Sequence, residues 1–218
     1  MDYYLAIETS TAPCSVALLQ GKDLLEECFI EEAKQTSALL AHRTEELLVR
    51  HQIKASTLKR IMVSIGPGSY TGLRVGLSFA KGLAYALSIP IQGVPSLKAL
   101  SLGYCLEEKD TADFIIPMYN ARRENVYCAI YDKEKNEVME PTLLSFEALY
   151  KKAKEYNNFV FVSPDSAILN KIFKLVLECK NLGARAYFVG YAGLTNEENA
   201  LGKGSAYLAP LYITNNYL

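Results

Sequence analysis

The order of strand-like and helix-like segments occurs twice along this chain, and no other feature constrains the fold as strongly. Each half is predicted to contain three strands, a helix, a strand and a second helix, from short apolar runs bounded by polar turns for the strands and apolar residues at helical spacing for the helices. In the first half we expect strands at 3–7, 14–19 and 24–30, a helix at 35–51, a strand at 60–65 and a helix at 69–87. In the second half we expect strands at 114–119, 125–132 and 137–144, a helix at 145–156, a strand at 159–163 and a helix from 164 onward. Only the order of elements repeats, since the residues themselves show no repeat.

This duplicated order predicts an α/β protein with the actin-like ATPase (ASKHA) fold. That fold has two ribonuclease H-like halves, each with a mixed sheet flanked by helices. A polar and charged stretch at 103–113 is typical of a join between domains, which gives an N-terminal half at 1–105 and a smaller C-terminal half at 106–218. The segment 207–214 is expected to be extended and to pack back on the body.

Composition excludes several classes of protein. The net charge of the 218 residues is −1, which provides no general attraction to nucleic acid. The cysteines number five, an odd count with no C-x-x-C pair, so neither a disulfide framework nor a zinc site is expected. The N-terminus lacks the basic start of a signal peptide, and no apolar stretch is long enough to cross a membrane. We therefore expect a cytoplasmic protein.

A glycine-rich segment, Gly66–Pro67–Gly68–Ser69, lies between a predicted strand and a predicted helix. Glycines permit tight turns, and the free N–H groups at a helix start attract anions, so Gly66, Gly68 and Ser69 are candidates for contact with a nucleotide phosphate. The segment has no Gly-Lys-Ser/Thr of a Walker A loop, and Thr71 stands where a dinucleotide motif needs its third glycine. The alternative stays open that these residues only turn the chain and cap the helix.

Glu8, Ser10 and Thr11 follow the first predicted strand. A carboxylate with neighbouring hydroxyls suits a magnesium ion and the phosphates that accompany it, so these three residues are further candidates for nucleotide contact. The alternative is a polar loop that closes a hairpin, and the local sequence by itself favours it.

The helix after the glycine-rich segment carries small residues four apart, at Gly72, Gly76 and Ala80. Since glycine inside a helix costs about 1 kcal/mol relative to alanine, this spacing indicates tight packing along one face. Either the chain's own first helix or sheet, or a second subunit, can fill that face.

Two other groups of residues were considered as sites. His42 and His51 are nine residues apart, which at about 100° per residue places them on opposite helix faces and excludes a shared metal ion. Arg122 and Arg123, near a strand start, are candidates for contact with RNA or with an acidic partner surface. No group of residues predicts a catalytic site.

Several segments together resemble the TsaB (YeaZ) family, whose members carry the older label glycoprotease-like. The resemblance is dense over residues 3–130 and is carried by the segments 7–11, 14–19, 65–76, 80–84, 94–97, 120–127 and 210–213. The chain departs from the family pattern at four positions. Glu8 and Asn120 stand where aspartate is usual, Thr36 where histidine is frequent, and Thr214 where arginine would complete the terminal motif.

The resemblance implies a non-catalytic partner subunit. Such chains support TsaD, which forms N6-threonylcarbamoyladenosine at position 37 of tRNAs that read codons starting with A, and the ATPase TsaE joins them. TsaD holds its metal through a His-x-x-x-His pair on its first helix, which this sequence lacks. The resemblance also implies a homodimer when the chain is alone, tRNA contact only through the complex, and ATP or ADP with magnesium only there. It favours an interface on the first-domain helices, with the residues Leu40, Gly72, Leu73, Gly76, Leu77 and Ala80.

The competing hypothesis is an actin-fold ATPase or small-molecule kinase that acts alone. It would use Glu8 and the 66–68 loop for phosphate, and a turn at Gly190–Gly193 is the candidate for its adenosine-binding segment.

Overall fold

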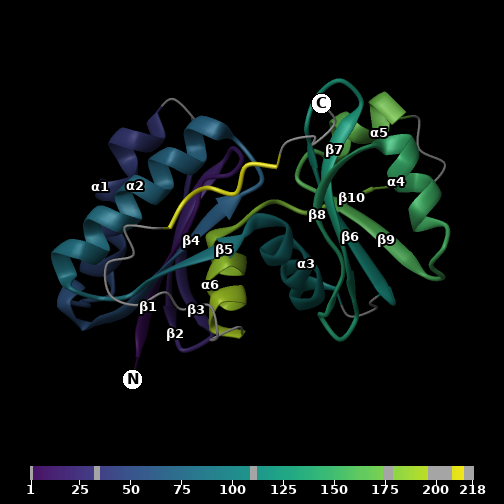
Figure 1. Ribbon diagram of the computed structural model, residues 1–218. Coiled ribbons are helices and arrows are strands. Elements are labelled where there is room, and N and C mark those ends of the chain that lie inside the picture. Colours follow the sequence, from purple (N-terminus) through teal and green to yellow (C-terminus); the bar gives the residue numbers. More distant parts are fainter. Residues whose placement is uncertain (1, 32–34, 109–111, 174–178, 196–207, 214–218) are drawn as a thin grey trace. The chain divides into compact units, whose positions relative to one another are not determined.

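The computed structural model describes residues 2–31, 35–108, 112–173, 179–195 and 208–213 (Figure 1). In the first part of the chain the elements are β1 (Tyr3–Glu8), β2 (Cys14–Gln20), β3 (Asp23–Ile30), α1 (Thr36–Arg50), a 3₁₀ turn η2 (Ala55–Thr57), β4 (Leu58–Gly66), α2 (Tyr70–Leu87), β5 (Ile91–Pro95) and α3 (Ser96–Glu107). In the second part they are β6 (Phe114–Asn120), β7 (Asn125–Asp132), β8 (Glu137–Ser145), α4 (Phe146–Ala153), β9 (Phe159–Ser163), α5 (Ser166–Phe173), β10 (Lys180–Asn181) and α6 (Ala186–Thr195).

The two sheets have the same topology. Their strand orders are β3-β2-β1-β4-β5 and β10-β9-β6-β7-β8. Read from β8 to β10, the second order matches the first, with β6 in the place of β1. In each sheet the first three strands form an antiparallel meander, and the next strand in the chain pairs parallel with the first one. This confirms the predicted duplication and the actin-like fold class.

The first sheet is covered by helices on both faces (Figure 1). Along β1 the side chains alternate, so Leu5 and Ile7 pack into the apolar cluster with α1 and α2, while Ala6 faces α6. Burial on both faces explains why β1 and β2 are almost entirely apolar and do not alternate between apolar and polar residues.

The helix α6 corrects one prediction from the sequence. Gly190 and Gly193 lie inside this helix, and the turn expected there is wrong. A Cβ on Gly190 would come within 2.8 Å of the Leu19 side chain, and one on Gly193 within 2.7 Å of Met62. These glycines let α6 approach the sheet closely, and the candidate adenosine-binding segment of the kinase hypothesis is therefore lost.

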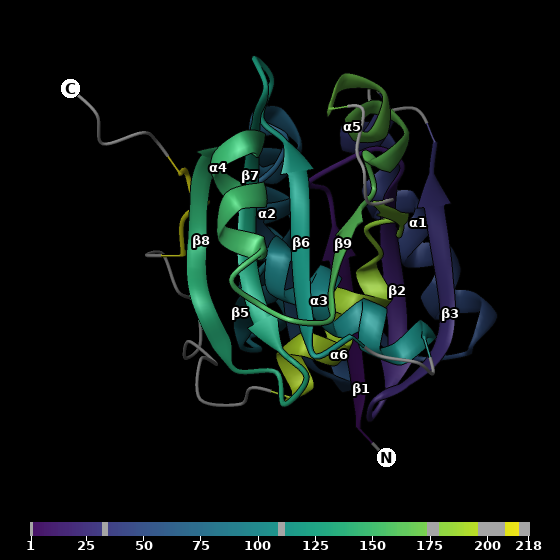
Figure 2. The same ribbon diagram turned by 90° about the vertical axis from the view of Figure 1, so that its right-hand side faces the viewer.

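The second sheet carries α4 across its strands (Figure 2). Phe146, at the start of α4, packs against Phe161 of β9 with ring centroids 5.8 Å apart. The helix expected from residue 164 onward corresponds to α5, and its predicted continuation over Leu175 and Val176 falls outside the described residues.

The chain forms two compact units, Met1–Ala99 with Ala184–Leu211, and Leu100–Gly183 with Tyr212–Leu218. This division differs from the expected boundary after residue 105 because α6 returns the chain to the first unit and because α3, which the sequence analysis missed, contains the boundary. Leu208 joins the core of the first unit, and the Leu211 N–H donates to the Ile65 carbonyl at 2.6 Å. Tyr207 and Thr214 lie outside the described residues.

Among the helices that the structure describes, none combines the length and the apolar character needed to cross a membrane.

Candidate functional site

The loop after β1 and the glycine-rich loop after β4 meet at the N-terminus of α2. The Ser69 N–H donates to the Ser10 carbonyl at 2.7 Å, and a Cβ on Gly68 would lie 2.5 Å from the Ser10 Cβ. Ser69 is the N-cap of α2, and its Oγ accepts a hydrogen bond from the Gly72 N–H at 3.2 Å. Two candidate segments 55 or more residues apart thus form one local structure, as the actin-like fold requires.

Gly66 is enclosed by the chain itself. Its φ of +109° lies in the region that favours glycine, and a Cβ there would come within 2.9 Å of both the Leu211 carbonyl and the Leu73 side chain. Its N–H donates to Ser96 Oγ at 3.2 Å. Gly66 is therefore buried under the C-terminal segment and offers no surface to a phosphate.

Glu8 acts as an internal acceptor. Its side chain is 1% exposed, and its Oε1 accepts hydrogen bonds from the Ser10 N–H and from Ser64 Oγ, the latter at 2.9 Å. Burial raises the pKa of this carboxyl above its ordinary value of 4.5. Glu8 thus ties the first loop to β4, and no group of metal-ligating residues occurs in the described parts of the chain.

A cavity of about 300 Å³ lies beside this junction, lined by Thr9, Thr11, Ala12, Cys14, Thr36, Ser69, Thr71, Gly72 and Val75. The lining residues that the structure describes offer hydroxyl groups, and none of them is charged. Of the six predicted nucleotide contacts, Thr11 and Ser69 reach this cavity, and for them the contact stays a prediction. Glu8, Ser10, Gly66 and Gly68 instead pack the loops together.

Thr36 is also held within this cavity wall. Its Oγ1 donates to Cys14 Sγ at 3.3 Å, and burial raises the pKa of the Cys14 thiol. The described part of the lining thus offers hydroxyls and a neutral thiol, groups that can bind a small polar group.

The residues predicted for an interface on α2 pack inside the first unit. A Cβ on Gly72 would lie 2.1 Å from the Thr9 carbonyl oxygen, and one on Gly76 would lie 2.1 Å from Thr9 Oγ1. The remaining residues assigned to that interface, Leu40, Leu73, Leu77 and Ala80, are buried in the core of the first unit. The small residues bring α2 against the chain's own β1–β2 loop, which is the alternative that spacing left open.

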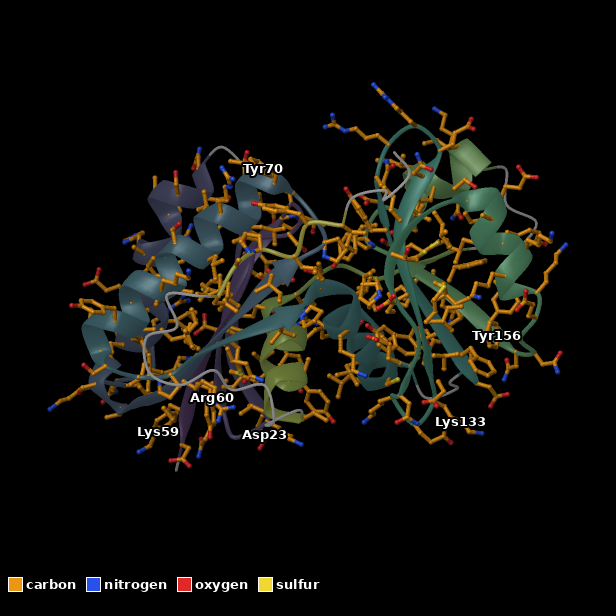
Figure 3. The ribbon with its side chains drawn as sticks, in the orientation of Figure 1. Asp23, Lys59, Arg60, Tyr70, Lys133 and Tyr156 are labelled. Atoms are coloured by element: carbon orange, nitrogen blue, oxygen red, sulfur yellow. The ribbon has the colours of Figure 1, made fainter. Side chains whose placement is uncertain are left out.

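The opposite side of α2, together with the exposed side of α1, forms what we call the outer face. Its small exposed residues on α2 are again four apart, at Ser78, Gly82 and Ala86, and no atom lies within 4 Å of the place where a Gly82 Cβ would be. Large exposed side chains accompany them: Tyr85 is 82% exposed, Val49 on α1 is 68% exposed, and Tyr70 is 55% exposed (Figure 3). The sequence analysis missed this second stripe, although its spacing is the same as that of the buried one.

The two histidines contact different glutamates. His42 Nε2 lies 3.2 Å from Glu46 Oε1, and His51 Nε2 lies 2.9 Å from Glu26 Oε2.

Arg122 and Arg123 are exposed in the turn between β6 and β7. The preceding Asn120 is fixed there, because its N–H donates to Asp165 Oδ2 at 2.9 Å and its Oδ1 accepts from the Arg122 N–H at 2.9 Å.

Two sheets of identical strand order, each with the actin-like arrangement of helices, place this chain in the class of actin-like ATPase folds. Solved structures show the same fold. A YeaZ from Pseudomonas aeruginosa superposes with a TM-score of 0.76 at 22% identity, covering 98% of this chain and 100% of that one. A polyphosphate/ATP-glucomannokinase from Arthrobacter sp. strain KM gives 0.52 at 11% identity, over 88% of this chain and 97% of that one.

Sequence comparison then specifies the family. A family model described as TsaD, tRNA N6-adenosine threonylcarbamoyltransferase, matches residues 31–203, so the chain belongs to this family and, within it, to the TsaB (YeaZ) group. The TsaB of Bacillus subtilis (strain 168) is 35% identical over 136 residues, which are 62% of this chain and 57% of that protein. The TsaB of Escherichia coli (strain K12) is 30% identical over 132 residues, 61% of this chain and 56% of that protein. The matched region thus spans little more than half the length of these relatives.

Proposed function

We propose that this chain takes part in the formation of N6-threonylcarbamoyladenosine in tRNA, as a non-catalytic partner subunit. Membership of the TsaB group supports the pathway, since relatives are named as tRNA threonylcarbamoyladenosine biosynthesis proteins. The site supports the non-catalytic role, because no base or charged side chain is among the described residues that line its cavity.

The outer face of α1 and α2 is the observation that carries this proposal. An exposed tyrosine and valine stand beside small residues that allow a second helix to approach closely. Exposed aromatic side chains that can anchor a partner are enriched in protein interfaces. The partner is a TsaD protein with the same fold, and TsaE joins the pair. In the absence of TsaD, the same face forms the homodimer.

Tyr85→Glu tests this assignment. Tyr85 is the most exposed large apolar residue in the described chain, so the change leaves the core intact, while a carboxylate buried in a dry interface without a partner lowers affinity. We expect the affinity for TsaD from the same genome, measured by calorimetric titration, to fall by roughly tenfold or more. The thermal unfolding curve stays unchanged.

Ile168→Glu is the matched control, because Ile168 is an exposed apolar residue on α5 of the second unit. It receives the same charge and is expected to leave the affinity unchanged. Equal affinities for the two variants would refute the outer face as the interface. Modification of tRNA by this chain alone, at the rate of the reconstituted proteins, would refute the non-catalytic role.

A further inference from the structure

The turn between β6 and β7 has a backbone that is unfavourable for its residues. Arg122, Arg123 and Glu124 have φ values of 65°, 50° and 61°, so three consecutive residues with a Cβ adopt the left-handed conformation. Such residues are normally single and are most often glycine or asparagine. A run of three indicates that the surrounding structure holds the turn in this shape.

Backbone hydrogen bonds hold it. The Ala121 N–H donates to the Asn125 carbonyl at 2.9 Å, and the Asn125 N–H donates to the Arg122 carbonyl at 3.0 Å. The Glu124 carbonyl accepts from the Phe146 N–H at 3.0 Å, which anchors the turn to the start of α4. The arginine side chains take no part in these bonds, so the turn presents them without needing them for its own stability.

These two guanidinium groups differ from the other arginines of the described chain. Arg43 and Arg50 pair with glutamates along α1 and β3, and Arg185 pairs with Glu27. Arg60 donates to Gln92 at 3.0 Å, and Arg74 lies 4.0 Å from the centre of the Tyr70 ring. Within the described residues, no ion pair or hydrogen bond involves the Arg122 or Arg123 side chain, and both residues are exposed.

We propose that Arg122 and Arg123 form a phosphate-binding turn that contacts the backbone of RNA. The choice of RNA rests on the proposed function in tRNA modification. A guanidinium presents a planar fork of donors that matches phosphate oxygens, and a fixed backbone lowers the entropy lost on binding. The turn contains no aromatic or large apolar residue that could anchor a protein partner, and its remaining side chains are those of Ala121, Glu124 and asparagines.

The RNA contact made by Arg122 and Arg123 is one part of a larger RNA-binding surface of the complex. With a net charge of −1, the chain has no general attraction to RNA, so two arginines fix the position of a strand that the partner subunit also holds.

The test compares the double variant Arg122→Gln, Arg123→Gln with Lys151→Gln, Lys152→Gln, which removes the same charge from α4 of the same unit. Each protein is mixed with TsaD, and complex formation is first measured by size-exclusion chromatography. Fluorescence anisotropy then gives the affinity for an unmodified tRNA transcript from about 50 to 200 mM salt, the range over which phosphate contacts dominate affinity.

We expect the arginine variant to form the complex normally and to bind tRNA roughly tenfold or more weakly near 0.1 M salt. Its slope of log affinity against log salt falls by about 1.5, since each phosphate contact contributes roughly 0.7–0.9. The lysine variant is expected to change the tRNA affinity and the salt slope only a little. Arg122→Lys with Arg123→Lys keeps the charge without the planar fork and gives an intermediate affinity.

Equal losses in the arginine and lysine variants, or no loss in either, would overturn the phosphate-binding turn while leaving the proposed function intact. Loss of the complex with unchanged RNA affinity would show a protein contact instead and would also overturn it. If native chain and TsaD form no complex, the proposed function fails, and the same titration with the chain alone at about 20 mM salt, where electrostatic contacts are strongest, decides the inference.

Discussion

The contact between Gly76 and Thr9 gives the sharpest prediction about stability. In a Gly76→Ala variant the new Cβ would lie 2.1 Å from Thr9 Oγ1, and it must move by about 1 Å to reach 3.0 Å, the shortest approach that real Cβ atoms make. Gly82 lies on the same helix, with no atom within 4 Å of its would-be Cβ. Gly82→Ala is therefore a control that changes helix propensity in the same way without crowding.

The expected magnitudes follow from two opposing terms. Replacing a helical glycine by alanine stabilises by about 1 kcal/mol, which is the full effect expected at Gly82. At Gly76, overpacking costs about 1–3 kcal/mol and offsets or exceeds that gain. We thus expect the two variants to differ by about 1–3 kcal/mol in free energy of unfolding. For a chain of this size that corresponds to roughly 2–12 °C in melting temperature.

Urea unfolding of both variants measures this difference, and Thr9→Ala identifies its source. Removing the Thr9 side chain vacates the space that the Gly76 Cβ needs, so Gly76→Ala in that background should become as favourable as Gly82→Ala. The resulting coupling between positions 9 and 76 is about 1–3 kcal/mol. Equal effects of the two alanines in the native background, or absence of coupling, would refute the close approach of α2 to the β1–β2 loop.

Three further outcomes are expected. Because the pKa of Glu8 is raised above 4.5 in the folded state, the native chain loses stability as pH rises from 4.5. Glu8→Gln lacks this loss, so its free energy of unfolding relative to the native chain should rise between about pH 4 and 7 in urea titrations. A difference between the two proteins that stays constant with pH would contradict this. Glu124→Gly relieves a left-handed φ of 61° and should stabilise by about 0.5–1 kcal/mol, whereas a lower melting temperature would argue against the left-handed turn. Burial raises the pKa of Cys128 and Cys179 to about 12, so iodoacetamide should label the partly exposed Cys28 well before either of them, as mass spectrometry of peptides will show.

The bounds of β1, β2 and β7 were predicted well because these strands are largely buried and are bounded by turn residues. β7 was placed at its observed bounds, and β1 and β2 were each one residue short. α6 was missed because its glycines suggest a turn in isolation. Their need for close contact arises from Leu19 and Met62, which lie far away in the sequence.

The site was harder to predict because spacing alone does not distinguish the two sides of a helix. On α2, both Gly72–Gly76–Ala80 and Ser78–Gly82–Ala86 recur every four residues. The first stripe adjoins Leu73 and Leu77, whose burial turns that side toward the sheet. The spacing therefore identified α2 as a helix with a stripe of small residues, but it did not show that this stripe is buried inside the chain's own first unit. Likewise, the sequence identified both loops as candidates for nucleotide contact, but it gave no sign that Leu211 would cover Gly66.

The return of α6 to the first unit has a consequence for synthesis of the chain. All five strands of the first sheet, with α1 and α2, are complete by Pro95, yet the helix that covers the sheet's other face begins at Ala186. At roughly 5–20 residues per second, a ribosome makes Leu100–Gly183, the main part of the second unit, before that face can be covered, so an apolar sheet surface stays open for several seconds in the nascent chain. During this interval the sheet is vulnerable to aggregation or to capture by a chaperone, whereas the second unit can fold as soon as it emerges.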